Sequence, residues 1–353
     1  MKKRYSIALV GCGAIAKKHI QAIADNKDIA YLKAVCDINL QSAQRIVDDY
    51  QDLVAQEEEI GLYDCFEALL AQGDVDIIAI TTINGLHAQY AVKCLKHHKN
   101  VILEKPLALS TQDAERVCAA ARASEGEITV CTQLRYAEPF LLLKELIANG
   151  QLGKIASIAV RVLRNRSEAY YTSAPWRGTW EKDGGTLLNQ GIHSVDLLLW
   201  LMGEQVESIY ANTATFIRPI ETEDYALLNL RFQSGAIGLV EATVCVYEHT
   251  FEDSITIIAE KGFVALGGPL MQHVLRWEIE GVEAPERCDM GTHRELYRDF
   301  ITRLEEGRQP MITVEEAKDA LNVILGAHLS NSEKRPVLFT EIDEDIMNFK
   351  NEK

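Results

Sequence analysis

Short apolar runs alternate with polar stretches of helical composition over the first 132 residues. The apolar runs predict strands at residues 7–10, 32–36, 75–80, 100–103 and 128–132. The stretches between them predict helices at 14–24, 40–59, 86–98 and 110–124, with a short helix after Asp64. Strands that are apolar at every position are typical of a parallel sheet covered on both faces. We therefore expect a doubly wound α/β domain at residues 1–132.

The hydrophobic period changes beyond a predicted helix at 139–149. Apolar and polar positions alternate along six further runs, at 155–162, 206–216, 225–232, 236–247, 254–259 and 272–279. A period of two predicts an open, mostly antiparallel sheet whose strands are connected by hairpins. Helices are expected at 185–202, 292–306 and 314–332, and the polar end from Asp343 is expected to fray. The predicted fold class is α/β plus α+β, with a second domain at residues 133–353.

The first strand ends in Gly11-x-Gly13, and a helix follows at once. A strand, a glycine turn and a helix in this order form the context of the dinucleotide fingerprint of the Rossmann fold. Gly11 permits the tight turn, Gly13 lets the backbone approach a pyrophosphate, and Ala16 replaces the third glycine. Asp37 ends the second strand, where an acid hydrogen-bonds the adenosine ribose and repels a 2′-phosphate. The pattern predicts that the cofactor is NAD.

The same segment has a second interpretation. A charged head, an apolar middle and Ala14-Ile15-Ala16 follow one another as in a secretory signal peptide. Two glycines interrupt the apolar part, and Lys17-Lys18-His19 follows directly. These features favour the fingerprint.

Composition and charge narrow the function classes. The chain has 353 residues, 47% of them hydrophobic, which is enough for two domains with a sizeable core. A net charge of −16 argues against partners such as nucleic acid or an anionic membrane surface. No stretch is long enough to span a bilayer. The eight cysteines are scattered, so we expect free thiols in the cytoplasm and neither disulfides nor a zinc site.

Two segments carry candidate chemistry. Lys105, in Glu104-Lys105-Pro106, follows a predicted strand at the edge where parallel sheets bind ligands, and it could stabilise a developing alkoxide. Taken alone, a lysine there is more often a solvated loop residue. Asn189 and His193 are four residues apart, so a helix would present both on one face, and His193 suits proton transfer. Taken alone, such a histidine is more often a core residue; Asp196 could orient it or cap a neighbouring element.

A basic segment lies between Gly153 and Trp180 in this otherwise acidic chain. It holds Glu168 as its single acid before Trp180 and five basic residues, which are Lys154, Arg161, Arg164, Arg166 and Arg177. Guanidinium groups bind carboxylate or diphosphate through two hydrogen bonds, so the segment favours an anionic ligand. The alternative for each arginine is the solvent side of a strand.

The chain resembles the Gfo/Idh/MocA oxidoreductase family over essentially its whole length. The resemblance rests on four motifs, which are Gly11-Cys-Gly13-Ala-Ile-Ala16, Thr81-Thr-Ile-Asn84 with His87, Glu104-Lys105-Pro106, and the Asn189-to-His193 spacing. It implies a Rossmann domain joined to an open sheet that forms the substrate site and the interface of a homo-oligomer, a dimer or a homotetramer. It also implies that Lys105 and His193 lie near the nicotinamide and the sugar hydroxyl. Many members have Asp at position 189; Asn189 cannot act as a base, which moves proton transfer to His193.

Within the family, the segments Tyr170 to Trp180 and Asp183 to Gln190 look most like the WlbA-type UDP-N-acetylglucosaminuronate 3-dehydrogenases. The cofactor-binding positions implied are Gly11, Cys12, Gly13, Ala14, Ile15, Asp37, Thr81, Thr82, Asn84, His87, Glu104, Lys105, Gln133, Trp176 and Arg177. The substrate-binding positions implied are Lys105, Arg135, Tyr136, Arg164, Arg166, Tyr170, Asn189 and His193. No metal ligand is expected.

The resulting hypothesis is an NAD-dependent dehydrogenase in nucleotide-sugar and surface-polysaccharide biosynthesis. It would oxidise the 3-hydroxyl of a UDP-linked N-acetylglucosaminuronic acid, with Lys105 and His193 as catalytic residues. One alternative is a dehydrogenase of a free aldose, inositol or other cyclic polyol, which needs no arginine clamp. The other is a non-catalytic cofactor-binding sensor, which needs no proton-transfer pair.

Overall fold

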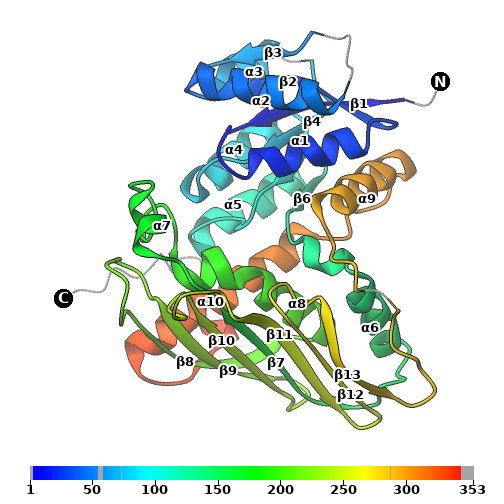
Figure 1. The fold of residues 1–353 in the computed structure, drawn as a ribbon, viewed down its shortest axis with the longest axis vertical. Helices are drawn as coiled ribbons and strands as arrows, with labels where there is room; N and C mark the ends of the chain where they lie inside the picture. The colour runs from blue at the N-terminus through cyan, green and yellow to red at the C-terminus, as the bar shows by residue number, and fades with distance from the viewer. Residues whose placement is uncertain (1–2, 55–58, 73, 287, 343–353) are drawn as a thin grey trace. The chain divides into compact units, whose positions relative to one another are not determined.

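The computed structural model describes residues 3–54, 59–72, 74–286 and 288–342 (Figure 1). It divides into two compact units. The first contains Met1–Ala108, Asp113–Gln133 and Thr292–Ala317, and the second contains Leu109–Gln112, Leu134–Gly291 and Lys318–Lys353. The end of the helix expected at 40–59 and the tail from Asp343 lie outside the described residues. The domain division at residue 132 stays a prediction.

The first unit is built on a six-stranded parallel sheet in the order β3-β2-β1-β4-β5-β6. Its strands are β1 (Tyr5–Val10), β2 (Ala30–Cys36), β3 (Gly61–Tyr63), β4 (Ile77–Ile80), β5 (Asn100–Leu103) and β6 (Ile128–Val130). Every residue of β1, β4 and β6 is buried, so both faces of the sheet are covered. This is the Rossmann order, with the switch point between β1 and β4. It confirms the predicted doubly wound sheet, and β1 is its buried centre, as the fingerprint interpretation requires.

Helices follow the strands of this unit in regular alternation. They are α1 (Ala16–Asp25), α2 (Leu40–Leu53), α3 (Phe66–Gln72), the 3₁₀ turn η1 (Asn84–Leu86), α4 (His87–Lys96), α5 (Thr111–Arg122) and α9 (His293–Glu306). Although α9 comes from the last quarter of the chain, it packs against α1. Thr292 and Glu295 form a capping box at its start, and Gly307 ends it in the left-handed conformation.

The second unit is built on an eight-stranded sheet in the order β13-β12-β11-β7-β10-β9-β8-β14. Its strands are β7 (Ile155–Leu163), β8 (Val206–Ala214), β9 (Tyr225–Phe232), β10 (Ile237–Thr243), β11 (Glu252–Ala259), β12 (Gly262–Gly267), β13 (His273–Ile279) and β14 (Val337–Leu338). The sheet is antiparallel except where β7 pairs with β10. The prediction of a mostly antiparallel sheet is confirmed; β12 and the two-residue β14 were not foreseen.

Helices pack on one side of this sheet, with α8 against β7. The helical segments are η2 (Gln133–Tyr136), α6 (Glu138–Ala148), α7 (Glu168–Thr172), η3 (Leu187–Gly191), α8 (Ile192–Met202), α10 (Val314–Glu333), which begins in the first unit, and η4 (Phe339–Glu341). One difference from the prediction matters for function: the stretch expected as one α-helix at 185–202 opens with a π-helical turn, η3. None of the described helices combines the length and the apolar character needed to cross a membrane.

Candidate active site

The glycine turn after β1 lies at the carboxyl edge of the parallel sheet. Gly11 has φ +99°, and a Cβ there would come within 2.8 Å of the Thr81 backbone. Only glycine meets both conditions. A Cβ on Gly13 would meet nothing within 4 Å, so the backbone here is open to a ligand.

The start of α1 suits an anion. Its N-cap, Ile15, offers no side-chain hydrogen bond, and its first turn contains no acid. The N–H groups of Ala16 and Lys18 donate to the carbonyls of Gly13 and Ile15, and the positive end of the helix dipole has no side chain to balance it. Asp37, at the end of β2, accepts hydrogen bonds from the backbone N–H groups of Cys12 (2.7 Å) and Asn39 (2.8 Å). The residues present fit a dinucleotide whose pyrophosphate rests on the turn and whose ribose meets Asp37.

His87 does not reach this open edge. It is fully buried, and its Nδ1 donates to the carbonyl of Pro106 at 2.7 Å. Its Nε2 lies 3.2 Å from the carbonyl of Thr82. Burial lowers the pKa of His87, which favours the neutral ring. His87 therefore joins the loop after β4 to the loop after β5, and any effect on a cofactor passes through those loops.

Glu104 and Lys105 follow β5 directly. Lys105 is half-buried, whereas Glu104 is 5% exposed. The carboxylate of Glu104 accepts hydrogen bonds from His19 (2.9 Å), from His293 (2.8 Å) and from the backbone N–H of Lys105 (3.1 Å). Neither histidine was foreseen, because one comes from α1 and the other from α9.

Asn189 and His193 belong to the second unit. Asn189 lies in η3 and His193 in the first turn of α8. Because a π-turn has more residues per turn than an α-helix, the assumption of regular α-helical spacing between them is wrong. Asp183 is buried; it accepts from the Asn189 amide and from the backbone N–H of Gly178 at 2.7 Å. Asp183 thus fixes the amide of Asn189, and only its place before Gly184-Gly185 hinted at such a role.

Glu223 is a second buried carboxyl group, packed below η3. One oxygen accepts from the backbone N–H of Leu187 at 2.8 Å, while Oε2 has no partner among the described residues. Burial, reinforced by Asp183 and Asp224, raises its pKa to about 8. A Cβ on Gly185 would come within 2.3 Å of this carboxyl group. Glycine is favoured here because φ is +97°, and because any larger residue would displace the carboxyl group of Glu223.

Two of the predicted arginines are already neutralised. Arg161 pairs with Glu241 at 2.8 Å on the exposed face of β7. Arg164 donates from two nitrogens to the carboxylate of Asp253, and from Nη1 to Gln190 at 3.1 Å. These pairs argue against Arg164 as the anion ligand.

Arg166 and Arg177 differ from them. Neither has an ion-pair partner in the described part of the chain, and Nε of each is buried without a hydrogen bond. The guanidinium of Arg177 lies 3.9 Å from the centre of the Tyr170 ring, and that of Arg166 lies 5.3 Å from it. The guanidinium of Arg177 also lies 4.7 Å from the centre of the ring of Trp176, which is half-buried. Two uncompensated positive charges thus meet around Tyr170.

Arg135 was predicted to bind substrate, but its geometry argues for a structural role. Its side chain is 1% exposed, and two of its nitrogens donate to Asp196, at 2.8 and 2.6 Å. Asp196, which was expected to orient His193 or to cap a neighbouring element, binds Arg135. Gln133 and Tyr136 lie half-buried beside it in η2.

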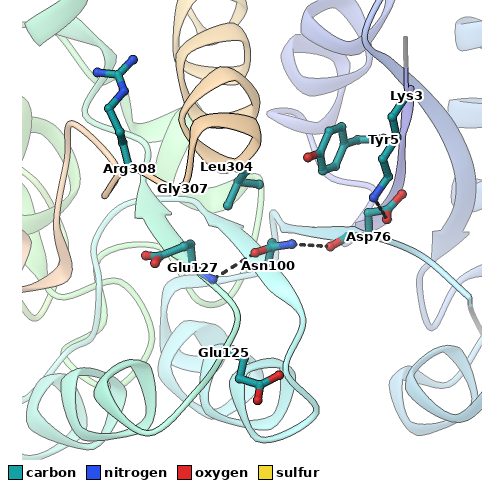
Figure 2. A pocket seen from close by; sticks show the side chains of 9 residues that line it. All are labelled: Lys3, Tyr5, Asp76, Asn100, Glu125, Glu127, Leu304, Gly307 and Arg308. Carbon is teal, nitrogen blue, oxygen red and sulfur yellow. Dashed lines mark hydrogen bonds and ion pairs between the residues drawn. The ribbon is translucent and has the colours of Figure 1, made fainter. Parts of the chain in front are cut away.

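A cavity of about 330 Å³ opens at the opposite edge of the parallel sheet (Figure 2). Asn100, the first residue of β5, joins the carbonyl of Asp76 to the backbone N–H of Glu127, each at 3.0 Å. These residues lie at the amino ends of β4, β5 and β6, whereas open parallel sheets bind ligands beyond the carboxyl ends of their strands. The cavity is therefore separate from the candidate cofactor site.

The comparisons with known proteins agree with this geometry. Residues 5–132 match the model of the oxidoreductase family with an NAD-binding Rossmann fold, and residues 140–265 match the GFO/IDH/MocA C-terminal domain. The WlbA dehydrogenase from Bordetella pertussis, solved in complex with NADH and UDP-GlcNAcA, is 33% identical, with a TM-score of 0.86 over 95% of this chain and 99% of that chain. The WlbA dehydrogenase from Chromobacterium violaceum, with the same ligands, is 33% identical, with a TM-score of 0.88 over 96% of each chain.

A curated relative has a different substrate. The myo-inositol 2-dehydrogenase from Thermotoga maritima is 27% identical over 95% of this chain and 99% of its own length.

The fold and the glycine turn define an NAD-dependent dehydrogenase. The chain belongs to the GFO/IDH/MocA oxidoreductase family.

Proposed function

We propose that the substrate is a UDP-linked N-acetylglucosaminuronic acid and that its 3-hydroxyl is oxidised to the 3-keto sugar. The observation that carries this proposal is the pair Arg166 and Arg177 around Tyr170, whose charges no carboxylate in the described residues balances. A half-buried guanidinium without a counter-ion is costly, and a carboxylate or diphosphate would compensate it. A neutral polyol would not.

The comparisons support the same substrate class. Two of the most similar solved structures contain NADH and UDP-GlcNAcA. Their 33% identity extends over 95% and 96% of this chain.

The proposed chemistry assigns one role to each of three residues. His193 accepts the proton of the 3-hydroxyl, and Lys105 stabilises the developing alkoxide. Asn189, held by Asp183, positions the sugar or the imidazole without ionising. Bound NAD would supply the acceptor for the hydride that leaves the sugar carbon. We place this reaction in nucleotide-sugar biosynthesis, and a cytoplasmic location stays a prediction.

The outer face of the second unit supports a homo-oligomer. Alternate residues of its strands are exposed, and among them are large apolar side chains, namely Tyr210, Leu227, Ile237, Leu239 and Ile258. An exposed apolar sheet face of this kind is typical of a surface that binds another chain. We propose a second copy of this chain as that partner, in a dimer or tetramer.

Arg166→Ala tests the proposed substrate. The Michaelis constant for UDP-N-acetylglucosaminuronate should rise about ten- to a hundredfold, because a charge-assisted contact contributes about 1.5–3 kcal/mol. UDP-N-acetylglucosamine lacks the carboxylate. If Arg166 binds the diphosphate, the Michaelis constant for this analogue should rise by the same factor; if Arg166 binds the carboxylate, it should change little. Arg161→Ala is the matched control: it removes an arginine that Glu241 neutralises on the exposed face.

The competing substrate is a free sugar or inositol, which the relative from Thermotoga maritima makes a specific alternative. Oxidation of myo-inositol or a free aldose, with neither nucleotide sugar oxidised, would replace the proposal by this alternative. Binding of NAD without turnover of any of them would favour a sensor.

A further inference from the structure

A buried network of side chains surrounds Glu104, behind the residue proposed to stabilise the alkoxide. His19 Nε2 and His293 Nε2 both donate to the same oxygen, Oε1, at 2.9 and 2.8 Å. The second oxygen, Oε2, accepts from the backbone N–H of Lys105 at 3.1 Å. Beyond His19, the hydroxyl of Tyr297 lies 2.7 Å from Nδ1. All these side chains are nine-tenths buried or more.

The protonation states in this network follow from its contacts. Burial holds the pKa of Tyr297 well above its usual range, so its hydroxyl keeps its proton and donates to Nδ1 of His19. Burial lowers the pKa of His19 to about 4, so the ring is neutral and Nε2 carries its single proton. That proton is donated to Glu104.

Glu104 is therefore an anion held by three hydrogen bonds. Its burial alone would raise its pKa, but the two histidines hold the pKa well below the usual range. The buried thiol of Cys131 also contacts the carboxylate, which helps to raise the pKa of Cys131 well above its usual value and keeps the thiol protonated. The result is a fixed negative charge one residue before Lys105.

We propose that Tyr297, His19, Glu104 and His293 form a positioning network for Lys105. The network fixes the backbone of Lys105 through its N–H and places a negative charge one residue before it. It joins three distant segments, α1, the loop after β5, and α9, and so gives the packing of α9 in the first unit a function. None of the four residues needs to contact substrate. The proposal rests on the role of Lys105 in the proposed function.

A metal site is the alternative for the same residues. The ligand atoms of His19, Glu104, Cys131 and His293 all lie within 4.8 Å of one another, and such a set suits zinc. Tetrahedral zinc with ligands at about 2.0–2.1 Å keeps them about 3.3 Å apart. Here each histidine nitrogen lies 2.8–2.9 Å from one carboxylate oxygen, which is hydrogen-bond distance. The geometry favours the network.

The first experiment needs no substrate. Lysine side chains are ¹³C-methylated, and Lys105→Arg identifies the Lys105 resonance, whose titration gives its pKa. Glu104→Gln should lower that pKa by about one unit, because it removes the adjacent negative charge. Glu127→Gln, a carboxyl-to-amide change at the opposite edge of the sheet (Figure 2), should leave it unchanged.

The second experiment measures turnover and NAD affinity in two variants of one residue. His293→Gln keeps an N–H donor, and its kcat should stay within about threefold of wild type. His293→Leu lacks the donor, and its kcat should fall more than tenfold with NAD affinity nearly unchanged. If His293→Leu does not fold, Tyr297→Phe, which removes one hydroxyl, takes its place and should lower kcat without changing NAD affinity.

The outcomes separate the two proposals. An unchanged Lys105 pKa in Glu104→Gln, equal kcat in the two His293 variants, or stoichiometric zinc in the purified protein would overturn the network. A shifted Lys105 pKa in a protein that oxidises neither nucleotide sugar would keep the network and reject the proposed substrate.

Discussion

In each unit a glutamate is buried close to a predicted site residue, and these two glutamates behave in opposite ways. Glu104, next to Lys105, has its pKa held well below the usual range. Glu223, below the turn that carries Asn189, has its pKa raised to about 8. Both are at most 5% exposed. Burial therefore does not explain the difference.

The number of donors explains it. Glu104 accepts from two imidazoles and a backbone N–H, whereas Glu223 accepts from the N–H of Leu187 and keeps one oxygen without a partner. The neighbours of Glu223 are the carboxyl groups of Asp183 and Asp224, which oppose its ionisation. Glu104 in the first unit is therefore ionised, whereas Glu223 in the second unit keeps its proton at neutral pH.

The largest expected effect comes from replacing the proposed catalytic residue of each unit. Lys105→Met and His193→Asn should each lower kcat by about 10²–10⁴-fold, because each removes a group that acts on the reacting hydroxyl. NAD affinity, measured by calorimetry, should stay nearly intact in both. If His193→Asn kept near-normal turnover across pH, the base would be reassigned to Lys105.

A smaller effect concerns stability and separates the two carboxyl groups directly. At pH 7, Glu104→Gln should lower the free energy of unfolding by about 3 kcal/mol, since it breaks several charge-assisted hydrogen bonds in the core. Glu223→Gln should cost far less, because an amide replaces a group that is already neutral. Urea denaturation of both variants measures the difference, and equal losses would contradict the comparison.

The pH dependence of stability should have opposite signs at the two sites. The folded state keeps the Glu223 proton up to about pH 8, while the unfolded chain releases it near 4.5, so stability falls as the pH rises through this window. The slope approaches about 1.4 kcal/mol per pH unit. Glu104 contributes stability that is full above pH 4.5 and is lost as the pH falls towards its lower folded pKa. Glu223→Gln should remove only the slope between about pH 4.5 and pH 8, as Tm measured against pH would show.

The smallest effect concerns Asp37, a half-buried carboxylate of the first unit. NAD should bind more tightly than NADP, because a 2′-phosphate would be repelled. In Asp37→Ala the ratio of the NAD affinity to the NADP affinity should fall about tenfold. Calorimetric titration with both nucleotides measures this ratio. Equal binding of NAD and NADP by the wild type would contradict the prediction.

Local signals made much of this protein predictable. The apolar runs predicted five of the six strands of the parallel sheet, since a strand buried on both faces is apolar at nearly every position. The short β3 was not predicted, because none of its residues is fully buried. The turn at Gly11 was predictable because a positive φ and a close approach to Thr81 both demand glycine. Alternation gave most of the second sheet, but not the π-turn at Asn189, because that turn depends on how Glu223 and Asp183 pack against it.

The sequence by itself determined the two sheets, the dinucleotide turn and the family. The partners of the charged side chains were decided only by the tertiary structure. Arg164 and Arg166 are two residues apart and look alike in the sequence, yet Asp253, on a distant strand, neutralises only Arg164. In the same way, Glu104 depends on histidines 85 residues before it and 189 residues after it. Electrostatic pairing acts through space over a few ångströms, and sequence separation carries no information about such distances.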